Sequence, residues 1–170
     1  MGLVIVLSQR KLFLKNRKPS WPTNCIDDWE EKSVPTQYLE QESKTIVNKV
    51  ESPDVGMSYS MNPYAGCEHG CIYCYARNVH EYWGYSAGLD FERKIIVKKN
   101  VIEVLEKTFS NKKWDPKPII LSGNTDCYQP IERDLEITRK ILQTCLKYKH
   151  PISIITKNSL ISRDLDILTD

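Results

Sequence analysis

Three cysteines at close spacing are the residues of this chain best suited to chemistry. Cys67, Cys71 and Cys74 follow the pattern CxxxCxxC within eight consecutive positions. Gly66 and Gly70 lie beside them and permit the positive φ angles and close backbone approach that a tight loop needs. Thiolates so close together can face one metal centre, and a polar loop with glycines is a poor place for three unligated cysteines. We therefore predict a metal centre at this loop.

Three thiolates leave one ligand place open. A structural zinc ion requires four ligands in a tetrahedron, and His69 or His80 are the candidates for the fourth. An iron–sulfur cube held by three cysteines instead leaves one iron open to an outside ligand. Structural zinc loops usually come as two CxxC pairs with a longer span between them, and this sequence has no second pair. These residues favour the iron–sulfur cube and leave zinc as the alternative.

The elements that must position this loop alternate between strands and helices. We predict strands at 58–63, 94–99, 118–123 and 151–158, and helices at 75–84, 101–109, 130–148 and 162–168. Apolar strands separated by amphipathic helices indicate a parallel sheet built of βα units. Such sheets place their chemistry beyond the carboxyl ends of their strands. The cysteine loop, residues 122–130 and residues 156–160 are therefore expected to meet at one edge.

Composition limits the class of protein. The chain has 170 residues, of which 41% are hydrophobic and 27% are charged, so it can form an ordinary core. The net charge of +2 neither implies nor excludes nucleic acid as a partner. The apolar run Leu3–Leu7 is shorter than the roughly 7–15 residues of a secretory signal or the ~20 of a membrane span. We expect a cytoplasmic protein with no membrane partner, whose cysteines are thiols or ligands.

The chain divides into two parts. Residues 1–54 are polar and broken by prolines, and we predict an irregular N-terminal leader with a short helix near 38–49. Residues 55–170 carry the βα pattern. The last helical pattern runs for only two turns and has no stop signal, so we expect later elements to be missing.

The motifs resemble those of a known superfamily. CxxxCxxC on the loop after the first strand of a βα repeat resembles the radical S-adenosylmethionine (SAM) enzymes. NPYAGCEHGCIYCYAR, with SGNTDCYQPIE and ITKNSLISRDLDIL downstream, is similar to the branch related to spore photoproduct lyase, also called DNA repair photolyase-like. This resemblance covers roughly residues 45 to 170. It implies an α/β fold, a partial (β/α) barrel truncated here after about three βα units.

The resemblance also implies a reaction. Cys67, Cys71 and Cys74 would bind a 4Fe-4S cluster, whose open iron binds the amino and carboxylate groups of SAM. Reduction then cleaves SAM to methionine and a 5′-deoxyadenosyl radical. The expected function is that of a radical SAM enzyme, with lyase activity and nucleic-acid repair or modification as the candidates. A flavodoxin or ferredoxin would supply the electron.

Further site residues follow from the same resemblance. The segment SGNTD replaces the Gly-Gly-Glu form of the family segment that receives the SAM amino group. Lys157 would pair with the SAM carboxylate, and the thiol of Cys127 is a candidate catalytic hydrogen-atom donor. The other residues expected to contact SAM are Tyr73 near adenine, Gly123, Asn124, Thr125 and Asp126 near the amino group, and Thr156 or Asn158 near the ribose. The alternatives without SAM binding are that Asp126 caps a local turn and that Lys157 faces solvent.

Two other classes of function compete with this one. The first is a zinc-bound interaction module. The second is an iron–sulfur electron carrier without SAM chemistry, which would make no use of the polar segments at 122–126 and 156–158.

Overall fold

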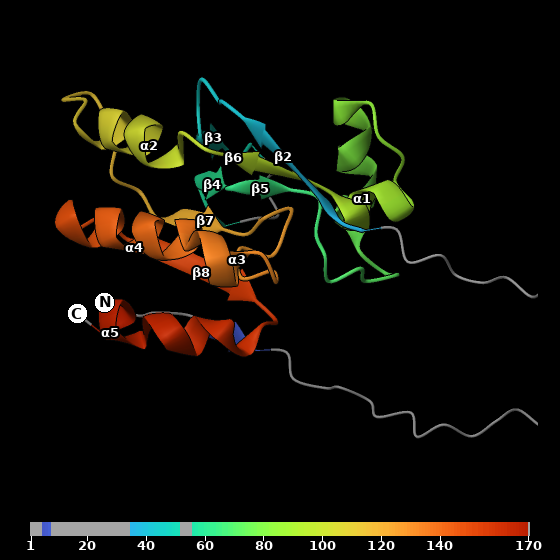
Figure 1. Ribbon diagram of the computed structural model, residues 1–170. Coiled ribbons are helices and arrows are strands. Elements are labelled where there is room, and N and C mark those ends of the chain that lie inside the picture. The colour runs from blue at the N-terminus through green and yellow to red at the C-terminus, as the bar shows by residue number, and fades with distance from the viewer. Residues whose placement is uncertain (1–4, 8–34, 52–55, 170) are drawn as a thin grey trace, which may run out of the picture.

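The computed structural model describes residues 5–7, 35–51 and 56–169, and Figure 1 shows their arrangement as an α/β fold with two small sheets. The larger sheet has the strand order β1 (Ile5–Leu7), β8 (Ile152–Thr156), β7 (Ile119–Leu121), β4 (Tyr59–Met61) and β3 (Val47–Lys49). Its strands are parallel except for β3, which runs antiparallel to β4. The expected parallel strands at 58–63, 118–123 and 151–158 are therefore neighbours in one sheet.

The smaller sheet has three strands, in the order β2 (Gln37–Gln41), β6 (Lys94–Lys98) and β5 (Tyr64–Ala65). β6 pairs parallel to β2 and antiparallel to β5. The expected strand at 94–99 thus forms, but in this second sheet and not among the parallel βα units. The described strands do not close into a barrel, and a radical SAM-type partial barrel stays a prediction.

Two amphipathic helices cover the larger sheet. α2 (Val101–Phe109) matches the predicted range, and α4 (Ile137–Lys147) lies across β7 and β8 in Figure 1. Their apolar faces meet the strands in one core, whose fully buried members include Met61, Leu105, Ile119, Leu121, Ile141 and Leu142. The remaining helices are η1 (Tyr75–Trp83), α1 (Leu89–Arg93), α3 (Glu132–Leu135), η2 (Ser159–Asp164) and α5 (Leu165–Leu168). No helix in the described ranges is long and apolar enough to cross a membrane.

The predicted single helix at 130–148 is wrong. It breaks at Glu136, whose φ of 51° ends α3 and separates it from α4. The Glu132 carboxylate accepts the backbone N–H of Thr138 at 2.9 Å, and the Thr138 hydroxyl donates to the carbonyl of Cys127 at 2.7 Å. These tertiary hydrogen bonds satisfy the first turn of α4 in place of a continuous helix.

The N-terminal leader also differs from the prediction. β2 and β3 lie where a short helix near 38–49 was expected, because each finds a partner strand in a sheet. Residues 1–4, 8–34 and 52–55 of the proposed leader lie outside the described residues.

An aromatic group surrounds His150 at the edge of the core. Its ring stacks on Phe109 with centroids 4.3 Å apart. Trp114 Nε1 donates to His150 Nε2 at 3.0 Å, and His150 Nδ1 lies 3.0 Å from the carbonyl oxygen of Pro151. These contacts fit a neutral ring with its proton on Nδ1, and burial lowers the pKa of His150.

This arrangement predicts an acid-dependent loss of stability. Because the folded pKa of His150 lies below the unfolded value of about 6.5, the unfolded chain gains its proton first as the pH falls. The stability is fully present above that pH and declines below it. We expect the melting temperature to fall between pH 7.5 and 5.5, and to fall less in His150→Gln, which keeps an acceptor for Trp114. Buried His80 titrates in both proteins, so equal slopes would contradict the assignment.

Candidate functional site

The cysteine loop, residues 66–74, runs from β5 to η1. Cys67 is buried, with 6% of its surface exposed, and its backbone N–H donates to the carbonyl of Phe91 at 2.8 Å. Two turns shape the loop. The N–H of Gly70 donates to the backbone carbonyl of Cys67 at 3.2 Å, and the N–H of Cys74 donates to the backbone carbonyl of Cys71 at 3.1 Å. All three thiols are free, and those of Cys71 and Cys74 are half-buried.

The predicted positive φ angles of the loop glycines are confirmed. Gly66 has φ 81° and Gly70 has φ 58°. A Cβ at Gly66 would lie 3.0 Å from the carbonyl oxygens of both Phe91 and Lys94. The loop therefore passes so close to the backbone around α1 that only glycine fits without strain.

Two side chains that sequence reasoning missed fasten the loop to neighbouring elements. Gln129 is fully buried, and its Oε1 accepts the N–H of Glu68 at 3.0 Å. The Glu68 carboxylate accepts the N–H of Ile131 at 2.9 Å and the hydroxyl of Tyr38 at 2.8 Å. The loop is thus tied both to the approach to α3 and to β2. Only the tertiary fold marks these residues out, since neither interrupts a sequence pattern.

Asp126 joins the cysteine loop to the ends of two parallel strands. Its Oδ1 accepts the Thr156 hydroxyl at 2.6 Å, and its Oδ2 accepts the Lys157 N–H at 3.0 Å. His69 Nε2 lies 3.5 Å from Oδ2, which is a close contact without hydrogen-bond geometry. Burial opposes ionisation, but these contacts and the N–H of Tyr128 hold the pKa of Asp126 below its ordinary value. The expected meeting of the three segments is therefore present.

Lys157 and Cys71 make the second link across this edge. The Lys157 ammonium contacts the Cys71 thiol, although the two residues are far apart in sequence. Its neighbour Asn158 is committed elsewhere, because its Oδ1 accepts the N–H of Leu160 at 3.0 Å and caps η2. The Asn158 Oδ1 atom thus caps η2, and the expected contact of Asn158 with a ribose stays a prediction.

The segment 122–126 divides between inward and outward side chains. Thr125 is buried, and its hydroxyl donates to the carbonyl of Tyr64 at 3.2 Å. The side chain of Asn124 is exposed, while its N–H donates to Asn62 Oδ1 at 2.9 Å. The carbonyl of Gly123 accepts the Tyr75 hydroxyl. Thr125 is thus a packing residue, and Asn124 is free to meet a ligand.

The surroundings of Cys67 act on its thiol in two opposite ways. Burial raises the pKa of this thiol to about 11, whereas the backbone N–H groups of Asp126 and His69 at its sulfur act in the opposite direction. Such N–H donors are among the hydrogen bonds that tune the sulfur atoms of iron–sulfur proteins. The described residues do not, however, form a preassembled group of three or more cysteine, histidine or acidic side chains around one metal position.

The two histidines differ in their relation to the thiols. His80 is buried between Phe91 and Tyr85, with ring centroids 5.6 and 5.4 Å away. Burial lowers the pKa of His80, and the nearby backbone carbonyls of Asp90 and Lys94 oppose that shift without meeting hydrogen-bond geometry. His69 faces Asp126, as described above. Neither placement favours a fourth zinc ligand, and Tyr73 projects from the loop with 82% of its surface exposed.

Cys127, the candidate hydrogen-atom donor, lies in the core and away from the polar edge. It is fully buried in the core beside Tyr128, and burial raises the pKa of its thiol. Its N–H donates to the Ser122 hydroxyl at 2.8 Å, which turns the residue inward just after the polar segment. Adjacency to Asp126 in sequence does not bring the thiol to the open edge.

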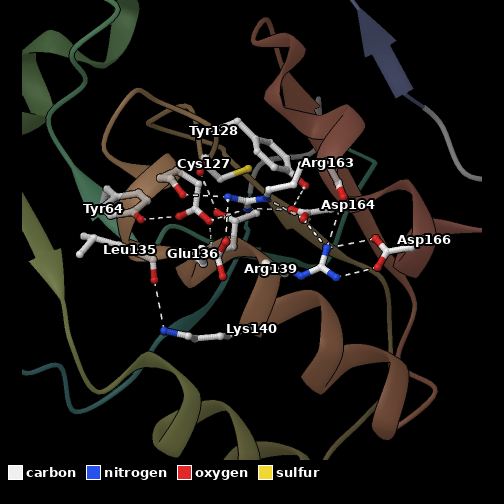
Figure 2. Close-up of polar contacts among 12 residues, drawn as sticks. Tyr64, Cys127, Tyr128, Leu135, Glu136, Arg139, Lys140, Arg163, Asp164 and Asp166 are labelled. Atoms are coloured by element: carbon white, nitrogen blue, oxygen red, sulfur yellow. Dashed lines mark hydrogen bonds and ion pairs between the residues drawn. The ribbon is translucent and has the colours of Figure 1, made fainter.

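Figure 2 shows an ionic network around Arg163 and Asp164. Glu132 and Asp164 are both fully buried. Arg163 bridges them, with Nη2 3.1 Å from Glu132 Oε1 and Nε 2.8 Å from Asp164 Oδ1. The Tyr64 hydroxyl donates to Glu132, and the Tyr128 hydroxyl donates to Asp164 at 3.1 Å. In the sequence these charges sit within amphipathic helices and look like solvated side chains, so they give no signal.

Comparison with known proteins gives relatives without an assigned activity. An uncharacterized protein of Mycobacterium tuberculosis is 35% identical over 128 residues, which are 75% of this chain and 38% of the relative. An uncharacterized protein of Methanocaldococcus jannaschii is 33% identical over 131 residues, covering 77% of this chain and 46% of the relative. The chain thus spans less than half the length of these curated relatives. No family model matches it. No solved structure matches it.

Two glycine substitutions test the loop geometry. Gly66→Ala adds a Cβ at positive φ and against two backbone carbonyls, whereas Gly84→Ala adds one at φ 76° with no atom within 4 Å. The left-handed conformation costs about 1–2 kcal/mol in both, and overpacking costs about 1–3 kcal/mol more at Gly66 alone. We expect chemical denaturation to show the larger loss for Gly66→Ala. Equal losses would mean that the close approach is absent.

The ionic network yields a separate prediction. Arg163→Met leaves the buried Glu132 carboxylate without a counter-charge, whereas Asp164 keeps its ion pair with Arg139 at 2.8 Å. We expect a loss of about 3 kcal/mol in the free energy of unfolding. Lys147→Met removes an exposed pair with Glu106 and is the matched control, with an expected loss below about 1 kcal/mol. Urea denaturation measures both, and similar values would contradict the role of Arg163.

Proposed function

We propose that this chain is part of a radical SAM enzyme. The observation that carries the proposal is the convergence of three free cysteines with the polar ends of β7 and β8, joined through Asp126 and Lys157. A zinc module or a simple electron carrier has no need for that polar edge.

The donor set supports an iron–sulfur cluster. Cys67, Cys71 and Cys74 would hold it, since their thiols are free and lie on one glycine-shaped loop. The N–H groups of His69 and Asp126 would stabilise the sulfur of Cys67 in its charged form. When bound, the cluster would supply the electron that cleaves SAM reductively to methionine and a 5′-deoxyadenosyl radical.

The polar edge would bind and orient SAM. The ammonium of Lys157 suits the SAM carboxylate, because a compact cation attracts it without demanding a fixed geometry. Asp126 attracts the SAM ammonium, while Thr156 holds the Asp126 carboxylate in place. Exposed Tyr73 and Asn124 are available for the adenine and for polar groups of the ligand. Thr125, Asn158 and Cys127 have structural roles in this proposal.

The activity of the whole protein is a further part of the proposal. The chain covers less than half the length of its relatives, so the substrate and the partners of the whole protein are proposals. A cytoplasmic enzyme that repairs or modifies nucleic acid, with an electron from a flavodoxin or ferredoxin, is the form that the motif resemblance favours.

Metal content and SAM binding test the proposal. After anaerobic reconstitution we expect about four iron and four sulfide per chain, and SAM binding by calorimetry that requires the cluster. Cys71→Ala should lose most of the iron and the SAM binding. Cys145→Ala removes a buried core thiol and is the matched control, which should keep both.

Two other outcomes would contradict the proposal. One zinc and no iron per anaerobically purified chain would favour an interaction module. A complete cluster that undergoes redox cycling without binding SAM would favour an electron carrier.

A further inference from the structure

A cavity of about 330 Å³ lies behind the cysteine loop. It is open between η1 and the smaller sheet, and its size is at the lower end for a small-molecule site. Cys71, Asp126 and Lys157 do not line it, so it is distinct from the polar edge described above. Asn124 and Thr125 contribute to both, which places any occupant next to that edge.

One wall of the cavity is apolar and aromatic. Trp83 and Ala76 contribute from η1, and Phe91 contributes from α1. Phe91 and Ala76 are buried, whereas Trp83 is half-buried and can still lose surface to a ligand. A wall of this kind gains most from a flat apolar body, since aromatic faces stack in offset or edge-on contact.

The cavity lining also carries a cation. Lys98 lies at the end of β6, and its Nζ donates to the carbonyl oxygen of Asn62 at 2.8 Å. Among the described residues, no aspartate or glutamate lines the cavity. Burial lowers the pKa of Lys98, and no carboxylate acts against that shift. Its neighbour Lys99 is different, being exposed and within 3.8 and 3.7 Å of Glu40 and Glu42.

A partly buried ammonium with one neutral acceptor is poorly compensated. Buried charges in proteins are ordinarily paired, because desolvation is costly without a counter-charge. Amide groups add donors beside it: Asn62 Oδ1 is taken by the N–H of Asn124, so its Nδ2 is the group left to donate. A cation flanked by donors is suited to an oxyanion.

We propose that this cavity binds a small organic anion with a planar aromatic body, its carboxylate or phosphate paired with Lys98 and its ring against Trp83. The lining supplies one charge and few other fixed partners, so the anionic group sets the orientation. This inference does not rest on radical SAM chemistry, and it is tested on the chain without metal.

A matched pair of probes tests the charge requirement. Ligand-observed NMR titrations with 2-naphthoate and 2-naphthamide compare an anion with a neutral amide of nearly the same shape. We expect the acid to bind at least about tenfold more tightly, as a hydrogen-bonded ion pair gives. 2-Naphthyl phosphate in place of the acid separates a phosphate site from a carboxylate site. Equal binding of acid and amide by the wild-type chain would overturn the proposal.

Variants locate the binding. Lys98→Met should abolish the preference for the acid, Lys98→Arg should keep it, and Lys99→Met should leave it unchanged as the matched control. Circular dichroism shows whether Lys98→Met folds. If it does not, the binding site is located on the wild-type chain. We then expect 2-naphthoate to broaden or shift the amide signals of Gly66 and Thr125. Shifts confined to the exposed residues Ile72, Tyr73 and Tyr75, or an equal loss in Lys99→Met, would refute the cavity as the site.

Discussion

The fold depends on two fully buried carboxylates, those of Glu132 and Asp164, that share one arginine. Charges in the interior are stable only when their hydrogen-bonding capacity is met. Arg163 and two tyrosine hydroxyls donate to these carboxylates, Arg139 adds a second cation at Asp164, and the N–H of Thr138 adds a donor at Glu132. Tyr64 belongs to the smaller sheet, whereas Asp164 ends η2 beside the larger one. The network therefore fixes β5, from which the cysteine loop begins, relative to the strands whose ends complete the site.

Asp126 shows how a local and a long-range role can belong to one side chain. Its Oδ1 accepts the N–H of Tyr128 two residues on, as a simple turn cap does. The same carboxylate also accepts from Thr156 and Lys157 at the end of another strand. The local cap is therefore confirmed, and the same turn holds the carboxylate that joins the two strand ends; its contact with SAM stays a prediction.

Features governed by local physics could be predicted from the sequence. The helix at 101–109 follows from its periodic apolar face, and the positive φ angles of Gly66 and Gly70 follow from a tight loop. Features that depend on residues distant in sequence could not be predicted in this way. The break at Glu136 depends on what the buried Glu132 carboxylate binds, and the inward turn of Cys127 depends on packing around Tyr128. The meeting of the polar segments lies between these cases, because strand order in a parallel sheet implies it without specifying which side chains touch.

The pairing of β1 with β8 joins segments that are far apart in sequence. Residues Ile5–Leu7 pair with Ile154–Thr156, so the outer strand of the larger sheet comes from the opposite end of the chain from its partner. During synthesis β1 is made before β8 and cannot pair with it until the residues between them have been added. The entropy of closing so long a loop grows only slowly with its length, but contacts of high sequence separation slow folding. The sheet is therefore expected to complete this edge last, after β4, β7 and β8 have assembled.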